Sequence, residues 1–145
     1  MYNASPFISI ITVCYNSENT IERTITSVLH QDFKDYEYII IDGASRDKTL
    51  YIIKQYEPLF KGRLKLISEP DKGIYDAFSK GCRLATGRFV WIVNSDDYLE
   101  PDALNTINKA IKDTDRKDIV VSFGMNFRSS DGSKILQCQS TNSEL

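Results

Sequence analysis

Four short apolar runs, each followed by a helical pattern, constrain the fold of this chain more than any other feature of its sequence. The runs occupy residues 7–14, 36–42, 64–67 and 89–93. Short runs that are rich in β-branched and aromatic residues are typical of strands buried on both faces. Because strands that alternate with helices favour right-handed crossovers, we expect an α/β fold with a doubly wound, mostly parallel sheet.

Helical spacing of apolar residues fills the segments between these runs. Asn19, with Glu22 three residues later, has the pattern of a capping box and predicts the start of the first helix. The second helix follows residues 43–45 and ends near Pro58. The third helix is predicted over residues 74–84, and a fourth begins near Pro101, since proline is favoured in a first helical turn.

The pattern changes near the carboxyl end of the sequence. After the apolar residues 119–121, the turn signal Asp131-Gly132 separates residues 125–127 from residues 134–136. Two short runs around such a turn favour a β-hairpin. We therefore expect a small antiparallel addition that closes an edge of the main sheet.

Length and composition are those of one globular domain. The 145 residues are 41% hydrophobic and 26% charged, which predicts a single domain over residues 1–145. The formal net charge of -2 lacks the basic excess that is typical of nucleic-acid-binding surfaces, so no nucleic acid partner is expected. Apolar runs are too short to span a bilayer, and the amino terminus has no signal segment. We expect a cytoplasmic protein.

The cysteines give no sign of a disulfide framework or a zinc site. Cys14, Cys82 and Cys138 are odd in number, widely spaced and outside any Cys-x-x-Cys pattern. We expect all three to be reduced, with Cys14 and Cys82 in the core.

Two adjacent carboxylates follow the fourth apolar run. Asp96 and Asp97 come at the carboxyl end of a predicted strand, where open α/β sheets bind their ligands. Paired hard oxygen donors suit Mg²⁺ or Mn²⁺, which can bridge protein carboxylates to the phosphates of a nucleotide. The alternative interpretation is that these acids only precede and cap the helix near Glu100 and Pro101.

Polar residues also follow the other three predicted strands. Because the carboxyl ends of parallel strands lie along one edge of a sheet, Tyr15, Asp42, Asp71 and Lys72 are expected to converge with the two aspartates. A carboxylate such as Asp42 can accept the imide N–H of uracil, Tyr15 can border the base, and Lys72 can neutralise phosphate. Taken singly, Asp42 is also consistent with a turn acid, and Asp71 with Lys72 is consistent with a solvated loop pair.

At these positions the sequence resembles the amino-terminal, nucleotide-sugar-binding half of family 2 glycosyltransferases of the GT-A fold, a Rossmann-like architecture. The motifs that carry the resemblance are residues 10–16 (IITVCYN), 27–31 (SVLHQ), 41–47 (IDGASRD) and 94–97 (NSDD), the last as the DXD-type motif. Residues 71–77 (DKGIYDA) are similar to the version in bacterial members that build lipopolysaccharide or exopolysaccharide.

The resemblance implies a role for each matching residue. Val13 and Tyr15 would border the nucleoside, Asp42 would bind the base, Asp96 would contact the ribose or diphosphate, and Asp96 and Asp97 would hold the metal. Asp71, Lys72 and Gly73 are assigned to nucleotide binding with them. The implied function is transfer of sugar from a nucleotide-diphospho-sugar, a UDP-sugar above all, to a saccharide or lipid-linked saccharide of a bacterial surface polysaccharide. Such an acceptor implies peripheral association with the inner face of the membrane.

Several positions depart from the family pattern. Gly43 stands where many relatives have a second acid, so base recognition rests on Asp42, and Asn94 replaces the first acid of a strict Asp-x-Asp. Phe78 stands where many relatives carry an arginine, and Lys72 or Lys80 is the candidate to supply that charge. Family members that invert the anomeric centre use a carboxylate base, which comes from a segment after the sheet described above. We therefore expect a donor-binding domain whose acceptor-binding part and catalytic base lie beyond Leu145.

The sequence lacks the motifs that are typical of other nucleotide-binding enzymes and of receiver domains. A dinucleotide-binding oxidoreductase needs Gly-x-Gly-x-x-Gly and a P-loop enzyme needs Gly-x-x-x-x-Gly-Lys after the first strand, and neither motif is in the sequence. A receiver domain would place acids where this chain has residues 14–16, and a nucleotidyltransferase would have a basic, glycine-rich loop there. A nucleotide-sugar-binding or interaction module without transfer activity stays open as the alternative.

Overall fold

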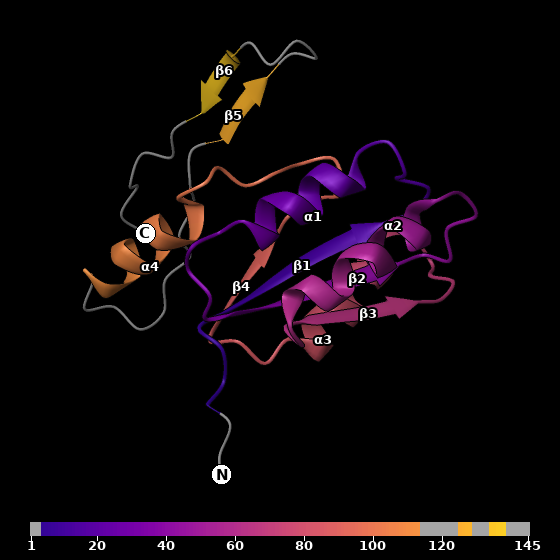
Figure 1. Ribbon diagram of the computed structural model, residues 1–145, viewed down its shortest axis with the longest axis horizontal. Helices are drawn as coiled ribbons and strands as arrows, with labels where there is room; N and C mark the ends of the chain where they lie inside the picture. The colour runs from indigo at the N-terminus through magenta and orange to yellow at the C-terminus, as the bar shows by residue number, and fades with distance from the viewer. Residues whose placement is uncertain (1–3, 114–124, 129–133, 139–145) are drawn as a thin grey trace. The chain divides into compact units, whose positions relative to one another are not determined.

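A four-stranded parallel sheet lies at the centre of the amino-terminal part of the chain (Figure 1). The computed structural model describes residues 4–113, 125–128 and 134–138. Its strands run in the order β3-β2-β1-β4. They are β1 (Ile8–Cys14), β2 (Tyr36–Asp42), β3 (Leu64–Ser68) and β4 (Phe89–Ile92). The four predicted strands and their parallel pairing are confirmed.

Helices alternate with the strands along the chain, as predicted. They are α1 (Ile21–Leu29), α2 (Thr49–Tyr56), the short 3-10 helix η1 (Glu57–Phe60), α3 (Ile74–Leu84) and α4 (Ala103–Lys112). The capping-box prediction is wrong, because Thr20 is the N-cap of α1 and no side chain caps this helix. The Glu22 carboxylate instead accepts a 2.6 Å hydrogen bond from the Tyr56 hydroxyl on α2.

Residues that alternate along β1 and β2 cover both faces of the sheet. Ile11, Ile39 and Ile41 pack with Ala77 of α3 in one buried cluster. On the opposite face, the Tyr36 hydroxyl donates to the Val28 carbonyl of α1, and the Tyr38 ring lies 5.4 Å from the Phe60 ring of η1. Helices therefore flank both faces of the central strands, as a doubly wound fold requires.

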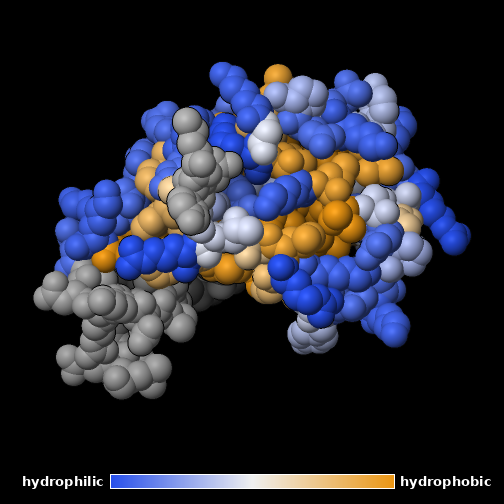
Figure 2. Space-filling model, turned by 90° about the horizontal axis from the view of Figure 1, so that it is seen from below, coloured by the Kyte–Doolittle hydropathy of each residue, from blue (hydrophilic) through white to orange (hydrophobic). Residues whose placement is uncertain are grey.

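β4 differs from the prediction that it is buried on both faces. Val90 and Ile92 are 49% and 41% exposed. β4 is the edge strand of this sheet, and α3 contacts β1 and β2, so the described helices leave this side of β4 open. On the face that Figure 2 shows, hydrophobic residues gather in a patch near the centre. Cys82 on α3 is also exposed, so only Cys14 of the two cysteines predicted in the core lies there.

The hairpin predicted near the carboxyl end is confirmed as a local structure. The chain divides into two compact units, residues 1–105 and 106–145, and the hairpin belongs to the second. β5 (Met125–Arg128) and β6 (Lys134–Cys138) pair antiparallel in a sheet of their own. The apolar residues 119–121 and the Asp131-Gly132 turn lie outside the described residues, and closure of the main sheet stays a prediction.

A buried carboxylate holds the amino-terminal edge of the sheet. Glu37 of β2 accepts hydrogen bonds from the Ser9 hydroxyl at 2.6 Å, from the Thr86 backbone N–H at 2.6 Å and from the Lys65 ammonium at 2.7 Å. Burial raises the pKa of this carboxyl, but the hydrogen bonds from Lys65, Ser9 and Thr86 outweigh it and lower the pKa to about 2. The ionised carboxylate thus joins β1, β2, β3 and the turn before β4.

The lowered pKa of Glu37 predicts acid-sensitive stability. Its contribution should be complete above about pH 4.5, the ordinary pKa of the unfolded chain, and should be lost as the pH falls toward about 2. Replacing Glu37 by Gln should therefore reduce the free energy of unfolding at pH 7 by on the order of 2 kcal/mol and flatten its pH dependence below pH 5. Urea unfolding at several pH values measures both effects. The exposed Glu57→Gln is the control and should retain the wild-type acid dependence.

Candidate functional site

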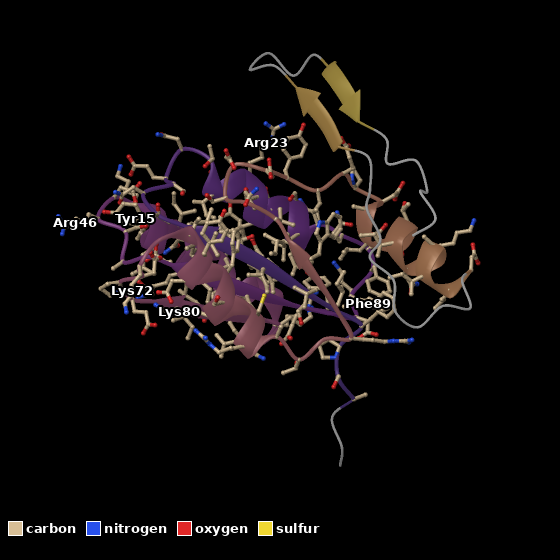
Figure 3. All side chains as sticks on the ribbon, turned by 180° about the vertical axis from the view of Figure 1, so that it is seen from behind. Tyr15, Arg23, Arg46, Lys72, Lys80 and Phe89 are labelled. Atoms are coloured by element: carbon tan, nitrogen blue, oxygen red, sulfur yellow. The ribbon has the colours of Figure 1, made fainter. Side chains whose placement is uncertain are left out.

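The carboxyl ends of the four parallel strands lie at one edge of the sheet, as the sequence predicts (Figure 1). The pairing continues just beyond the strand ends, since the Gly43 N–H donates to the Cys14 carbonyl at 2.9 Å and the Glu69 N–H donates to the Asp42 carbonyl at 3.0 Å. Figure 3 places Tyr15, Lys72 and Lys80 at this end of the molecule, with Phe89 at the other end. Arg46, which is not among the predicted site residues, lies beside Tyr15 in the same view.

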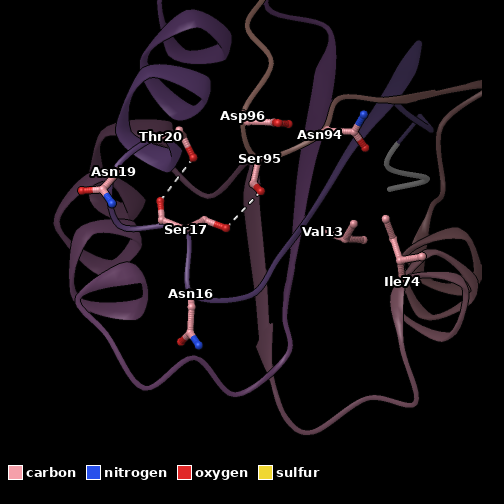
Figure 4. Close-up of a pocket in the computed structure, with 9 residues that line it drawn as sticks. All are labelled: Val13, Asn16, Ser17, Asn19, Thr20, Ile74, Asn94, Ser95 and Asp96. Carbon is pink, nitrogen blue, oxygen red and sulfur yellow. Dashed lines mark hydrogen bonds between the residues drawn. The ribbon is translucent and has the colours of Figure 1, made fainter.

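An open pocket of about 440 Å³ lies at this edge (Figure 4). Of the predicted site residues, Val13 and Asp96 line it. The other lining residues were not in the predicted set: Asn16, Ser17, Asn19, Thr20, Ile74, Asn94 and Ser95. Most of them follow the end of β1 or β4 closely in the sequence. Their position after a strand end is the feature that could have identified them from the sequence. Tyr15, Asp42, Asp71, Lys72, Gly73 and Asp97 lie at the same edge but do not line this pocket.

The loop that carries the two aspartates is held by polar side chains of α1. The Thr24 hydroxyl lies 3.0 Å from the Ser95 carbonyl and 2.5 Å from the Asp97 carbonyl. Further along, the Leu99 N–H donates to the Ser27 hydroxyl at 3.0 Å. The Ser17 hydroxyl, after β1, also lies 3.0 Å from the Ser95 hydroxyl (Figure 4). These contacts fix the backbone of the turn and leave the carboxylates to the solvent.

Asp96 and Asp97 are both exposed, and neither makes an ion pair within the described part of the chain. The Asp97 carboxylate accepts one hydrogen bond, from the Asn94 amide at 3.1 Å. The capping interpretation finds no support, because α4 begins only at Ala103 and an N-cap residue directly precedes its helix.

A divalent ion would find two protein carboxylates here and few other ligands. Among the described residues, no group of three His, Cys, Asp or Glu side chains is placed to hold a metal ion. Mg²⁺ is commonly held by one or two carboxylates, with water and substrate phosphates completing its coordination. Asp96 and Asp97 therefore fit an ion that binds together with a diphosphate, and they do not fit a metal cage built by the protein alone.

Asp42 lies beneath this edge and is fully buried. Its Oδ1 accepts the Ser45 hydroxyl at 2.5 Å, and its Oδ2 accepts the Ser68 hydroxyl at 2.7 Å. The Cys14 thiol, 3.7 Å away, also points to Oδ1. Burial and the neighbouring Asp42 carboxylate raise the pKa of that thiol, so it stays protonated. Both oxygens of Asp42 are thus engaged inside the protein, which argues against a direct contact with a nucleotide base.

The loop between β3 and α3 is shaped by its own backbone contacts. Gly73, with a φ of 110°, adopts a conformation that favours glycine and is the N-cap of α3. The Asp71 Oδ1 accepts the Gly73 N–H at 2.9 Å. The Lys80 ammonium is occupied by the Pro70 carbonyl at 3.1 Å and the Glu69 carboxylate at 3.0 Å. Of the two lysines considered for a phosphate contact, the exposed Lys72 is therefore the one without an ion pair in the described structure.

Comparison with known proteins assigns the family. The model of "Glycosyl transferase family 2" matches residues 9–140. The chain belongs to glycosyl transferase family 2. Among curated members, a PGL/p-HBAD biosynthesis glycosyltransferase of Mycobacterium tuberculosis is 33% identical over 118 residues, which cover 81% of this chain and 46% of that protein. The chain thus spans less than half the length of this relative.

Solved structures of glycosyltransferases share the GT-A fold of this family 2 chain. S. aureus TarS 1–349 in complex with UDP-GlcNAc aligns with a TM-score of 0.66 and 30% identity over 73% of this chain and 31% of TarS. The mannosyltransferase PcManGT from Pyrobaculum calidifontis, in complex with GDP-Man and Mn²⁺, aligns with a TM-score of 0.64 and 26% identity over 76% of this chain and 32% of PcManGT. Within the described residues, no helix is both long and apolar enough to cross a membrane.

Proposed function

We propose that this family 2 domain binds a UDP-sugar through Mn²⁺ or Mg²⁺ and supplies the sugar for a bacterial surface polysaccharide. The observation that carries the proposal is the exposed Asp96-Asp97 pair, held on a fixed turn beside an open pocket at the carboxyl edge of a parallel sheet. The acceptor would be a saccharide or a lipid-linked saccharide, reached by peripheral association with the inner face of the membrane.

Electrostatics is the reason for including a metal. A phosphate charge about 4 Å from a carboxylate is repelled by about 4 kcal/mol per unit-charge pair at an effective dielectric constant of ~20. Asp96 and Asp97 would hold a divalent ion, which would turn this repulsion into attraction. When bound, such an ion also stabilises the charge on a departing diphosphate. Lys72 is the candidate to neutralise a phosphate oxygen beside it, and Val13 and Tyr15 would border the nucleoside.

The relatives support the choice of ligand. TarS was solved with UDP-GlcNAc and PcManGT with GDP-Man and Mn²⁺, so both classes of nucleotide sugar have precedents on this fold. The resemblance of residues 71–77 to bacterial lipopolysaccharide and exopolysaccharide enzymes favours a surface polysaccharide as the product.

Thermal unfolding with and without metal tests the proposal. With Mn²⁺ present, a UDP-sugar at a hundred times its dissociation constant should stabilise the protein by about 2.7 kcal/mol, whereas the same ligand with EDTA should give a much smaller shift. Free sugar with Mn²⁺ serves as the negative control. Equal melting temperatures under all conditions would contradict the proposal. Metal-dependent binding without sugar transfer by the full-length protein would instead support the binding-module alternative.

A further inference from the structure

We propose that the Asp71 carboxylate, which fills the space above Gly43, reads the nucleotide base and selects bases that carry a ring N–H. This inference rests on the proposed function and deepens it. The family resemblance implies base recognition by Asp42, but this side chain is fully buried and both of its oxygens accept hydrogen bonds from the protein. A carboxylate that reads a base must have an oxygen free to accept a hydrogen bond from it.

Asp71 occupies the position that Gly43 leaves empty. A Cβ atom added to Gly43 would lie 2.6 Å from Asp71 Oδ2 and 3.4 Å from Cδ2 of the Tyr15 ring. The loop after β3 thus places a carboxylate over Gly43, beside the exposed ring of Tyr15. A side chain at position 43 would have to move the Asp71 carboxylate away from this place.

The two oxygens of Asp71 have different roles. Oδ1 accepts the Gly73 N–H at 2.9 Å and so holds the side chain in the loop. Oδ2 receives no hydrogen bond from the described part of the chain and faces the space above Gly43. An ionised carboxylate only accepts hydrogen bonds, so Oδ2 can pair with N3–H of uracil or N1–H of guanine. The corresponding ring nitrogens of cytosine and adenine are acceptors and would be repelled.

Asp71→Asn tests this inference, because it replaces the hydrogen-bond acceptor that faces the base with a donor. The amide oxygen can keep the Gly73 hydrogen bond, while the amide NH₂ takes the place of Oδ2 and offers a donor to the base. With Mn²⁺ present, UDP affinity should fall at least tenfold, and the ratio of UDP to CDP affinity should fall further, because cytosine N3 can accept from the new donor. Calorimetry with UDP, CDP, GDP and ADP gives these ratios. Glu69→Gln is the control, since it removes the same charge from an exposed position of the same loop and should keep the wild-type ratios.

Exchanging the two positions tests the geometry. Gly43→Ala alone should displace Asp71 and lower UDP affinity, whereas Gly43→Asp combined with Asp71→Ala should recover UDP over CDP selectivity. Unchanged nucleotide ratios in Asp71→Asn, in a protein that binds UDP with Mn²⁺, would overturn this inference and leave the proposed function intact. Failure of the wild-type protein to bind any of the four nucleotides would overturn both.

Discussion

Replacing Asp97 by Asn is expected to lower Mn²⁺-dependent UDP affinity by at least tenfold. Asp97 is exposed and its carboxylate has one hydrogen-bond partner, the Asn94 amide. With two protein carboxylates at this turn, losing one removes half of the protein's charge on the ion. UDP binding also depends on that ion, because the protein carboxylates and the diphosphate would both bind to it. Calorimetric titration of UDP at saturating Mn²⁺ measures the loss.

Without metal, Asp97→Asn should no longer weaken UDP binding. In EDTA, Asp97 only repels the diphosphate, so Asp97→Asn should bind UDP no more weakly than the wild-type protein. Asp102→Asn removes the same charge from an exposed position five residues later and should resemble the wild type in both arms. Wild-type affinity of Asp97→Asn at saturating Mn²⁺ would exclude Asp97 as a metal ligand.

The fold was largely predictable because its strongest determinants are local in sequence. β2 has the predicted bounds, residues 36 to 42, since every residue of the run is buried and the run stops at a charged turn. α3 also has its predicted bounds, residues 74 to 84. Because strands alternate with helices along the chain, the strands run parallel, and the polar residues at their carboxyl ends lie at one edge of the sheet. The placement of the candidate site at this edge follows from connectivity alone, without knowledge of any side-chain contact.

Features that depend on distant partners could not be predicted. The burial of Asp42 depends on Ser68, a residue 26 positions away, and the turn at Asp97 depends on Thr24, 73 positions away. The exposure of Val90 and Ile92 depends on the sheet order, which places β4 at an edge. None of these pairings leaves a periodic pattern in the sequence. The same holds for Asp71 above Gly43, because the contact joins the loops after β3 and β2.

Asp42→Ala is expected to destabilise the protein by about 3 kcal/mol or more and to lower its melting temperature by roughly 6–12 °C. The buried carboxylate accepts the hydroxyls of Ser45 and Ser68 and the backbone N–H of Ser45. Removing the buried carboxylate breaks all three of these hydrogen bonds, each to a charged acceptor and worth about 1.5–3 kcal/mol before the partly exposed serines are solvated. Urea unfolding and calorimetry measure the loss.

Asp71→Ala is the matched comparison, because Asp71 lies at the same edge but is half-buried and accepts one hydrogen bond, from the Gly73 N–H. It should leave the melting temperature near the wild-type value and abolish the preference for UDP over CDP. At a temperature where both variants are folded, Asp42→Ala should weaken UDP and CDP by similar factors, since a disturbed turn affects both ligands alike. A selective loss of UDP in Asp42→Ala, with wild-type stability, would return base recognition to Asp42. Loss of stability in Asp42→Ala together with loss of nucleotide selectivity in Asp71→Ala would show that the two carboxylates have different roles. Asp42 would then stabilise the edge of the sheet, and Asp71 would face the ligand.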